Sequence, residues 1–325
     1  VLYEEGHVAA KTAGIARAII KRFRDILNAS KFDIVYLFRT ANLAGPAFLE
    51  RLVTIRKIPM IFDFDDAIYM TNTSDANRKF GWLKFAEKTA DICRISTSVS
   101  VGNSHLADYA KQFNENVFVI PTSIDTDNYQ SDGHANGENE RVVVGWTGSS
   151  TSQYHLEAFE PTLVELLERR DDVEIRVISN REPSFRQIPY TWREWSPESE
   201  VAEISEIEIG IMPTPDDEWS RGKCALKALQ YMSLGIPAIC TDMGANRDAI
   251  KHGENGYLAK TQDQWLEYFD RLIDDKTLRK KMGSEAKRTV LDGYSMKKCA
   301  ELFAEAVRRT IAIGSRGNET RNKQE

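Results

Sequence analysis

The chain has 325 residues, of which 42% are hydrophobic and 28% charged, a composition that suits a globular protein with two domains of ordinary size. A net charge of −6 argues against a nucleic-acid partner, although a local basic pocket could still bind an acidic substrate. We expect neither a membrane-spanning segment nor a signal peptide. The cysteines show no metal-ligand spacing, so we expect a cytoplasmic protein with free thiols at Cys93, Cys224, Cys240 and Cys299.

The pattern of apolar and basic residues over 7–30 predicts an amphipathic helix at the start of the chain. The apolar residues expected to face inward are Ile15, Ala18, Ile19, Phe23 and Ile26. The basic residues expected to face outward are Lys11, Arg17, Lys21 and Arg24. This basic face is either solvated or in peripheral contact with an anionic membrane, as a lipid-linked acceptor would require.

Apolar runs then alternate with helical patterns, which predicts an α/β domain. The expected strands lie within residues 32–38, 59–69, 97–104 and 117–121. The expected helices lie within residues 43–56, 82–93 and 105–113. The polar, glycine-rich segment 131–140 lacks periodicity and is the best candidate for a domain boundary.

A strand–loop–helix–strand unit in the second half is the most informative part of the sequence. An apolar strand ends at Pro213, a polar loop follows, a helix is predicted over 222–235, and a second apolar strand begins at Ile236. Ligands of parallel sheets bind beyond the carboxyl ends of such strands. Lys223, Lys227 and Gln230 fall at i, i+4 and i+7 of that helix, so we expect them to share one face. The two lysines at the helix N-terminus then form a phosphate site. The alternative is a surface helix with solvated lysines.

Two glycine turns could bring backbone donors close to the same ligand. Gly148 and Ser149 follow the first strand of the second half, and Gly244 follows the strand that begins at Ile236. Small residues at such turns allow a diphosphate to approach the backbone closely. An ordinary strand-to-helix turn would have the same composition.

Three carboxylates, Asp63, Asp65 and Asp66, crowd the end of one strand. They could hold a divalent metal, orient a hydroxyl or act as a base, or they could form a turn and capping cluster. The strand ending in Asp-x-Asp resembles the nucleophile motif of haloacid-dehalogenase phosphatases. That motif belongs on the first strand of its domain, whereas another strand precedes it here, and Ala67 replaces its threonine.

An ordered set of motifs in the second half resembles the donor domain of the GT-B-fold glycosyltransferases of retaining family 4, also called group 1. The residues that carry this resemblance are Met212-Pro213, Leu229-Gln230-Tyr231-Met232, Gly235, Pro237-Ala238-Ile239, Gly244 and Glu254-Asn255-Gly256-Tyr257. The resemblance implies two Rossmann-like domains with an interdomain cleft. We expect an acceptor-side domain over 1–135 whose first strand is missing ahead of Val1, a donor domain over 136–292, and a helix over 293–325 that returns to the first domain.

The resemblance also implies a function. A hexosyltransferase-like, retaining enzyme would move a sugar from a nucleotide-diphosphate donor to a glycan or lipid-linked acceptor, in glycan or cell-envelope polysaccharide synthesis. No cofactor or metal is needed if cations neutralise the phosphates. The expected catalytic residues are Asp65, Asp66, Lys223 and Lys227. The expected donor-binding residues are Gly148, Ser149, Arg221, Cys224, Gln230, Glu198 and Gly244.

Three departures from the family pattern keep a second hypothesis open. The two acids of the family's Glu-x7-Glu pair would fall on Gly222 and Gln230, and the Arg and Lys that follow the turn at Gly148 are absent. Asp65 stands where many members carry a histidine. A catalytically silent GT-B-like binding subunit is therefore the main alternative, and a phosphatase is the less favoured one.

Overall fold

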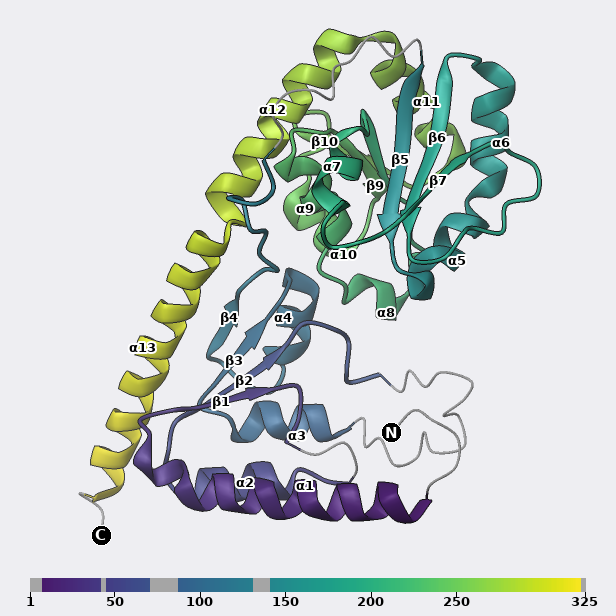
Figure 1. Cartoon of the computed structure of the whole chain (residues 1–325). Coiled ribbons are helices and arrows are strands. Elements are labelled where there is room, and N and C mark those ends of the chain that lie inside the picture. The colour runs from purple at the N-terminus through teal and green to yellow at the C-terminus, as the bar shows by residue number, and fades with distance from the viewer. Residues whose placement is uncertain (1–7, 42–44, 71–86, 131–140, 323–325) are drawn as a thin grey trace. The chain divides into compact units, whose positions relative to one another are not determined.

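The computed structural model describes residues 8–41, 45–70, 87–130 and 141–322 of the chain (Figure 1). The chain divides into two compact units. The first comprises residues 1–102, 106–120 and 302–325, and the second comprises 103–105 and 121–301. Each unit has its own parallel β-sheet with helices packed against it, which confirms the predicted α/β class. The predicted domain boundary at 131–140 lies outside the described residues.

The sheet of the first unit has four parallel strands in the order β1-β2-β3-β4. The strands are β1 (Val35–Phe38), β2 (Met60–Phe64), β3 (Ser98–Val101) and β4 (Val117–Val119). The helices in this part of the chain are α1 (Val8–Asn28), the short 3-10 helix η1 (Ala29–Lys31), α2 (Phe48–Ile55), α3 (Glu87–Ile95) and α4 (Ser104–Ala110). Residues of α13 (Met296–Asn322) from Leu302 onward belong to the same unit, where Thr310 hydrogen-bonds Ser98 and Phe303 packs edge-on against Tyr36.

Helix α1 forms where the sequence predicts it, but its apolar face is not buried as predicted. Among its described side chains Ile26 is buried, whereas Ala18 and Phe23 are exposed. The side chains of Lys11, Ile15 and Ile19 lie outside the described residues. The amphipathic pattern fixes which residues share a face, but burial needs a partner surface, which the pattern does not supply. None of the helices that the structure describes is both long and apolar enough to cross a membrane.

The sheet of the second unit has six parallel strands in the order β10-β9-β8-β5-β6-β7. The strands are β5 (Val142–Gly148), β6 (Val173–Ser179), β7 (Thr191–Glu194), β8 (Ile209–Met212), β9 (Ala238–Thr241) and β10 (Gly256–Ala259). All four residues of β8 are buried, as expected for a central strand covered on both faces. The order reverses between β5 and β8, so this sheet is doubly wound around a switch point.

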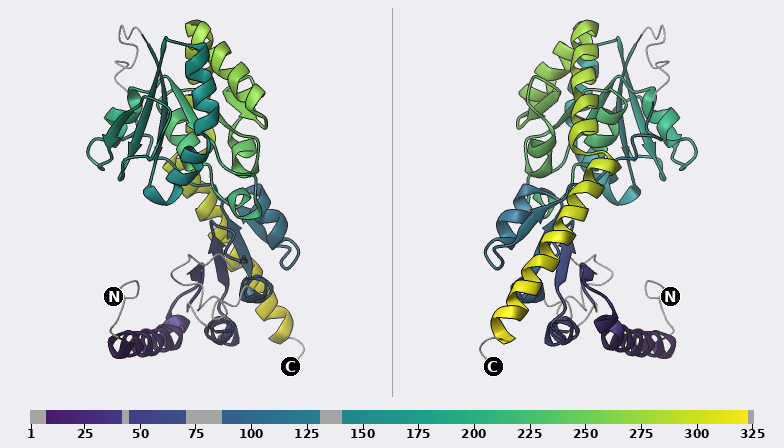
Figure 2. Two further views of the ribbon diagram at one scale, coloured as in Figure 1. Left: turned by 90° about the vertical axis from the view of Figure 1, so that its right-hand side faces the viewer. Right: turned by 90° about the vertical axis from the view of Figure 1, so that its left-hand side faces the viewer.

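Helices cover both faces of this sheet. One core contains side chains from α5 (Ser150–Ala158), α6 (Glu160–Arg169) and α11 (Gln262–Asp274). The other contains side chains from α7 (Glu200–Ser205), α9 (Leu226–Ser233), α10 (Gly244–Ala249) and α12 (Lys276–Gly293). The left-hand view in Figure 2 looks onto the first layer and the right-hand view onto α12 in the second.

The predicted helix over 222–235 is wrong in its first turn. A short helix, α8 (Glu218–Arg221), is capped by Asp217, whose carboxylate accepts a hydrogen bond from the Ser220 amide at 2.7 Å. Helix α9 begins only at Leu226 because Ala225 adopts the left-handed conformation, with φ 54° and ψ 23°. That conformation is incompatible with a right-handed helix, so Lys223 lies in the loop before α9 and does not share a helical face with Lys227.

Two glycines bring α12 against the end of α9. Gly235 ends α9 with a φ of 75°, and a Cβ atom placed on Gly283 of α12 would lie 1.9 Å from the carbonyl oxygen of Gly235. Only a residue without a side chain permits that approach. The packing of α12 over the layer that contains α9 therefore depends on Gly283.

We predict that Gly283→Ala destabilises the protein by about 1–3 kcal/mol, because the new methyl group must push α12 away from Gly235. Gly293 lies in the same helix, and a Cβ atom placed there would meet nothing within 4 Å among the described residues. Gly293→Ala is therefore the matched control and is expected to be neutral or stabilising. Urea denaturation of both variants measures the difference. Equal midpoints for the two variants would contradict the close approach.

Candidate functional site

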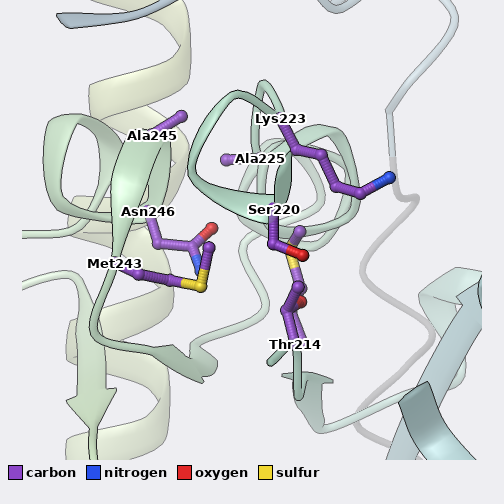
Figure 3. Close-up of a pocket in the computed structure, with 8 residues that line it drawn as sticks. Thr214, Ser220, Lys223, Ala225, Met243, Ala245 and Asn246 are labelled. Atoms are coloured by element: carbon purple, nitrogen blue, oxygen red, sulfur yellow. The ribbon is translucent and has the colours of Figure 1, made fainter. Parts of the chain in front are cut away.

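A small pocket, with room for about one water molecule, lies beyond the carboxyl ends of β8 and β9 (Figure 3). It is formed by the end of β8, the loop around α8 and the start of α10. The lining residues are Met212, Thr214, Ser220, Lys223, Ala225, Met243, Ala245 and Asn246. This is the edge of a doubly wound sheet at which ligands generally bind.

Lys227 lies against the carboxyl end of β5. Its ammonium nitrogen is 5.4 Å from the centre of the Trp146 ring, a cation–π contact. A Cβ atom on Gly148 would lie 2.6 Å from the Lys227 Cε and 2.6 Å from the Trp146 ring. Gly148 thus leaves the space that the lysine side chain occupies. The structure brings together Gly148 and Lys227, two of the predicted site residues.

A third basic side chain, His155 of α5, belongs to the same cluster. Burial and the charges of Lys223 and Lys227 lower the pKa of His155 to about 4, against the opposing influence of Asp217. Burial and the charge of Lys223 likewise lower the pKa of Lys227 to about 8. The sequence analysis missed His155, although its position seven residues after Gly148 on the following helix would have justified considering it.

The two lysines differ from Arg221 in how their charges are compensated. Across the ranges that the structure describes, neither Lys223 nor Lys227 forms an ion pair, whereas Arg221 does. The Arg221 guanidinium contacts the carboxylates of Asp216 at 2.7 Å and Glu218 at 3.9 Å, so its charge is already compensated. Like charges held together without compensation are stabilised by an anionic ligand.

The loop that carries Lys223 is fixed by its backbone. Asn103, which belongs to the second unit, donates hydrogen bonds from its side-chain amide to the carbonyls of Gly222 and Lys223, at 3.0 Å each. A Cβ atom on Gly244 would lie 2.6 Å from the carbonyl oxygen of Arg221, and Gly244 has a φ of 44°. Gly244 therefore lets α10 approach this loop. Cys224 is half-buried in the same loop.

Ser149 occupies the N-cap position of α5 and is exposed. Its hydroxyl group hydrogen-bonds the Thr151 hydroxyl at 2.7 Å. The amide of the next residue, Ser150, donates to the side chain of Asn180. The turn after β5 is thus fixed by polar contacts on both sides of Ser149.

Gln230 is buried and engaged with residues of its own unit. Its side-chain amide donates to the Tyr129 hydroxyl at 2.8 Å and to Glu200 at 3.1 Å. Glu200 also accepts hydrogen bonds from Tyr129 and from the Trp195 indole. Glu198, the residue proposed from the sequence, is exposed in the loop between β7 and α7. The carboxylate that lies beside Gln230 is that of Glu200, which the sequence analysis did not single out.

The charge of the acidic cluster in the first unit is partly compensated by an arginine. Arg39, which has a φ of 59°, contacts Asp65 at 2.8 Å and Asp66 at 2.6 Å. Asp63 accepts a hydrogen bond from the Tyr36 hydroxyl, and burial raises the pKa of Asp63. In the described ranges, no group of three or more His, Cys, Asp or Glu side chains is arranged to hold a metal ion. At the end of β2, Asp65 and Asp66 are therefore ion-paired with Arg39, and Asp63 is hydrogen-bonded to Tyr36.

Comparisons with known proteins find a family and a relative that match part of the chain. Residues 219–289 match the family described as Glycosyl transferases group 1. N-acetyl-alpha-D-glucosaminyl L-malate synthase of Bacillus anthracis is 29% identical over 80 residues, which cover 24% of this chain and 21% of that enzyme. The chain thus aligns with about a fifth of that relative.

Solved structures resemble nearly the whole chain. Sucrose-phosphate synthase from Thermosynechococcus elongatus matches with a TM-score of 0.64 at 11% identity, over 90% of this chain and 77% of that one. Anabaena HepE in complex with UDP-glucose matches with a TM-score of 0.62 at 13% identity, over 89% and 82%. A glycosyltransferase from Rickettsia africae matches with a TM-score of 0.63 at 14% identity, over 95% and 84%.

These likenesses cover both units, and the family match lies on the segment that contains Lys223, Lys227 and α10. The chain has the GT-B fold, and its residues 219–289 resemble the group 1 glycosyltransferases.

Proposed function

We propose that the chain is a glycosyltransferase that moves a sugar from a nucleotide-diphosphate donor to a glycan or lipid-linked acceptor, with retention at the anomeric carbon, in the synthesis of a glycan or cell-envelope polysaccharide. The observation that carries this proposal is the pair of uncompensated lysines, Lys223 and Lys227, at the carboxyl edge of the sheet in the unit that matches the family. The complexes of Anabaena HepE with UDP and UDP-glucose support a nucleotide diphosphate as ligand.

The chemical demand on such a site is to stabilise the leaving diphosphate as the glycosidic bond breaks. Preorganised cations at the developing charge are the largest contribution that an enzyme can make to that step. Burial makes the charge of Lys227 more effective than the same charge in water. Both ammonium groups are present before the reaction, so no metal ion is required for this role.

The remaining residues proposed from the sequence would support the binding of donor and acceptor. Gly148, Ser149, Gly244 and the loop residues Arg221 and Cys224 would shape the diphosphate site, and Gln230 and Glu198 would lie toward the nucleoside. Asp65 and Asp66 would accept a hydrogen bond from a sugar or acceptor hydroxyl, with Arg39 holding them in place.

A silent nucleotide-sugar-binding subunit is the second candidate. Gly222 has no side chain with which to contact a donor sugar, and the amide nitrogen of Gln230 is engaged by Tyr129 and Glu200. Both features remove polar groups from the positions where the family carries its acids. Such a protein would bind the donor without turnover.

We predict that Lys223→Ala and Lys227→Ala each lower turnover at least about tenfold, equivalent to about 1.4 kcal/mol of transition-state stabilisation, without unfolding the protein. Release of nucleotide from a panel of UDP- and GDP-sugars measures turnover. Lys280→Ala, which removes an exposed lysine of α12, is the matched control for net charge. Wild-type turnover in both site variants rejects their role, and tight binding without turnover by the wild type favours the silent subunit.

We predict that affinity for UDP or GDP falls as the pH rises through about 8, because Lys227 then loses its proton in the free protein. Removing the repulsion from Lys223 raises the pKa of Lys227, so in Lys223→Met the fall should begin at higher pH, on top of a weaker affinity. Calorimetric titrations between about pH 7 and about pH 10 measure both effects. A wild-type affinity that stays constant over this pH range would contradict the prediction.

We also propose that α1 contacts an anionic membrane surface. Ile20 and Leu27 are 64% and 59% exposed, and they lie on the helix among the exposed basic residues Arg17, Lys21 and Arg24. Apolar side chains flanked by cations match the interface of an anionic bilayer. The alternative is a solvated helix.

We predict that the protein cosediments with phosphatidylglycerol vesicles and not with phosphatidylcholine vesicles. The double variants Ile20→Ser/Leu27→Ser and Lys21→Gln/Arg24→Gln should each lose most of this binding, since both burial and charge contribute. Lys280→Ala should bind like the wild type. Undiminished binding by both double variants would assign any membrane contact to another surface.

A further inference from the structure

A segment of three residues, Asn103–His105, belongs to the second unit, whereas the residues on both sides of it, 1–102 and 106–120, belong to the first. The segment follows β3, and Ser104 is the first residue of α4. Each of its three side chains bonds to the part of the second unit that surrounds Lys223. We refer to these three residues as the anchor segment.

Asn103 is the residue of the anchor segment that reaches the loop carrying Lys223. It is 1% exposed. Its side-chain nitrogen lies 3.0 Å from each of the carbonyl oxygens of Gly222 and Lys223, and 3.5 Å from that of Arg221. A carboxamide has two N–H donors, so the two shorter contacts can use both of them. One side chain thus holds two successive peptide groups of the loop.

The other two residues of the anchor segment tie it to the helices on either side of that loop. The amide and the hydroxyl of Ser104 donate to the two carboxylate oxygens of Asp248 in α10, at 3.0 and 2.7 Å. The Nε2 atom of His105 lies 3.0 Å from the Glu218 carboxylate in α8. Supporting contacts of this kind fix the orientation of the group between them, which here is the amide of Asn103.

The loop needs this support because its own conformation is unfavourable. Ala225, which separates α8 from α9, has a φ of 54°, a value that alanine rarely adopts unless surrounding contacts impose it. No ion pair with a described residue holds the side chain of Lys223 in place. Figure 3 shows Lys223 and Ala225 on this loop. The position of the Lys223 ammonium group therefore depends on how the backbone of the loop is held.

The position of Lys223 matters to its neighbours through its charge. Burial and the charge of Lys223 lower the pKa of Lys227 to about 8, so the two ammonium groups interact in the unliganded protein. An anionic ligand gains most from both charges if they are already close together when it arrives. Ordering the loop during binding would reduce the affinity instead.

We propose that Asn103 is a positioning residue for the binding of an anionic ligand: by holding the carbonyls of Gly222 and Lys223, it keeps the Lys223 ammonium group beside Lys227 before the ligand arrives. This inference rests on the proposed function. It adds to the site a residue that acts through Lys223, 120 positions away in the sequence, and that need not contact the ligand itself.

A double-mutant cycle tests whether Asn103 acts through Lys223. Affinities for UDP and GDP are measured by calorimetry for the wild type, Asn103→Ala, Lys223→Met and the double variant. We expect Asn103→Ala to bind the preferred nucleotide about fivefold more weakly than the wild type, and the double variant to bind it as Lys223→Met does. A general loosening of the fold would weaken binding in both backgrounds.

The pH dependence of binding gives a second readout. In Asn103→Ala the fall in affinity should begin at higher pH than in the wild type, as in Lys223→Met, because Lys223 then repels Lys227 less strongly. Asn114→Ala is the matched control. The Asn114 amide also donates to two carbonyls, those of Cys93 and Ser96 at 2.8 Å each, but within the first unit, so nucleotide affinity should not change.

If Asn103→Ala does not fold, Ser104→Ala takes its place, because it removes only an exposed hydrogen bond to Asp248. We expect it to bind nucleotide about twofold more weakly, again with no further loss in the Lys223→Met background. Equal losses in both backgrounds, or wild-type affinity in the folded anchor-segment variants, overturn this inference while the proposed function stands. A wild type that binds neither nucleotide rejects the proposed function and this inference with it.

Discussion

The candidate ligand site of the second unit depends on the repulsion between basic side chains that the fold holds together. Lys227 is half-buried over Trp146, and Lys223 acts on it from the neighbouring loop. Burial, together with the charges of both lysines, keeps His155 of α5 neutral. Folding alone gains nothing from this arrangement, because burial and mutual repulsion both disfavour the charged forms. An anion bound at the cluster would stabilise the charged forms of the lysines against burial and repulsion. The arrangement therefore serves the binding of a ligand and not the stability of the fold.

Glycines determine how closely the elements around this cluster approach. Gly148 leaves room for the Lys227 side chain, and Gly244 lets α10 lie against the carbonyl of Arg221. Each of these positions would place a Cβ atom within 2.6 Å of its neighbour. Backbone packing, and not ion pairing, therefore sets the positions of both lysines. Arg221 differs, because its ion pair with Asp216 holds its side chain in place.

The sequence predicted the fold class, most strands and the lysine cluster, because periodic burial and strand–loop–helix order leave a local pattern. It did not predict the break between α8 and α9, since alanine rarely adopts the left-handed conformation found at Ala225. It also missed His155 and Glu200, whose roles depend on which elements the tertiary fold brings together. The exposure of Phe23 on α1 has the same origin: periodicity predicts a face, and only the neighbouring elements decide whether that face is buried.

The left-handed alanine has a consequence for how related sequences can diverge. A methyl group in this conformation costs about 1–2 kcal/mol relative to an unstrained backbone, so the loop between α8 and α9 persists because Asn103 and α10 hold it from outside. Glycine at position 225 would relieve that cost and give the loop more freedom, at the loss of one methyl group from the pocket lining. Evolution can thus adjust the stiffness of this segment through one backbone position, separately from its chemistry.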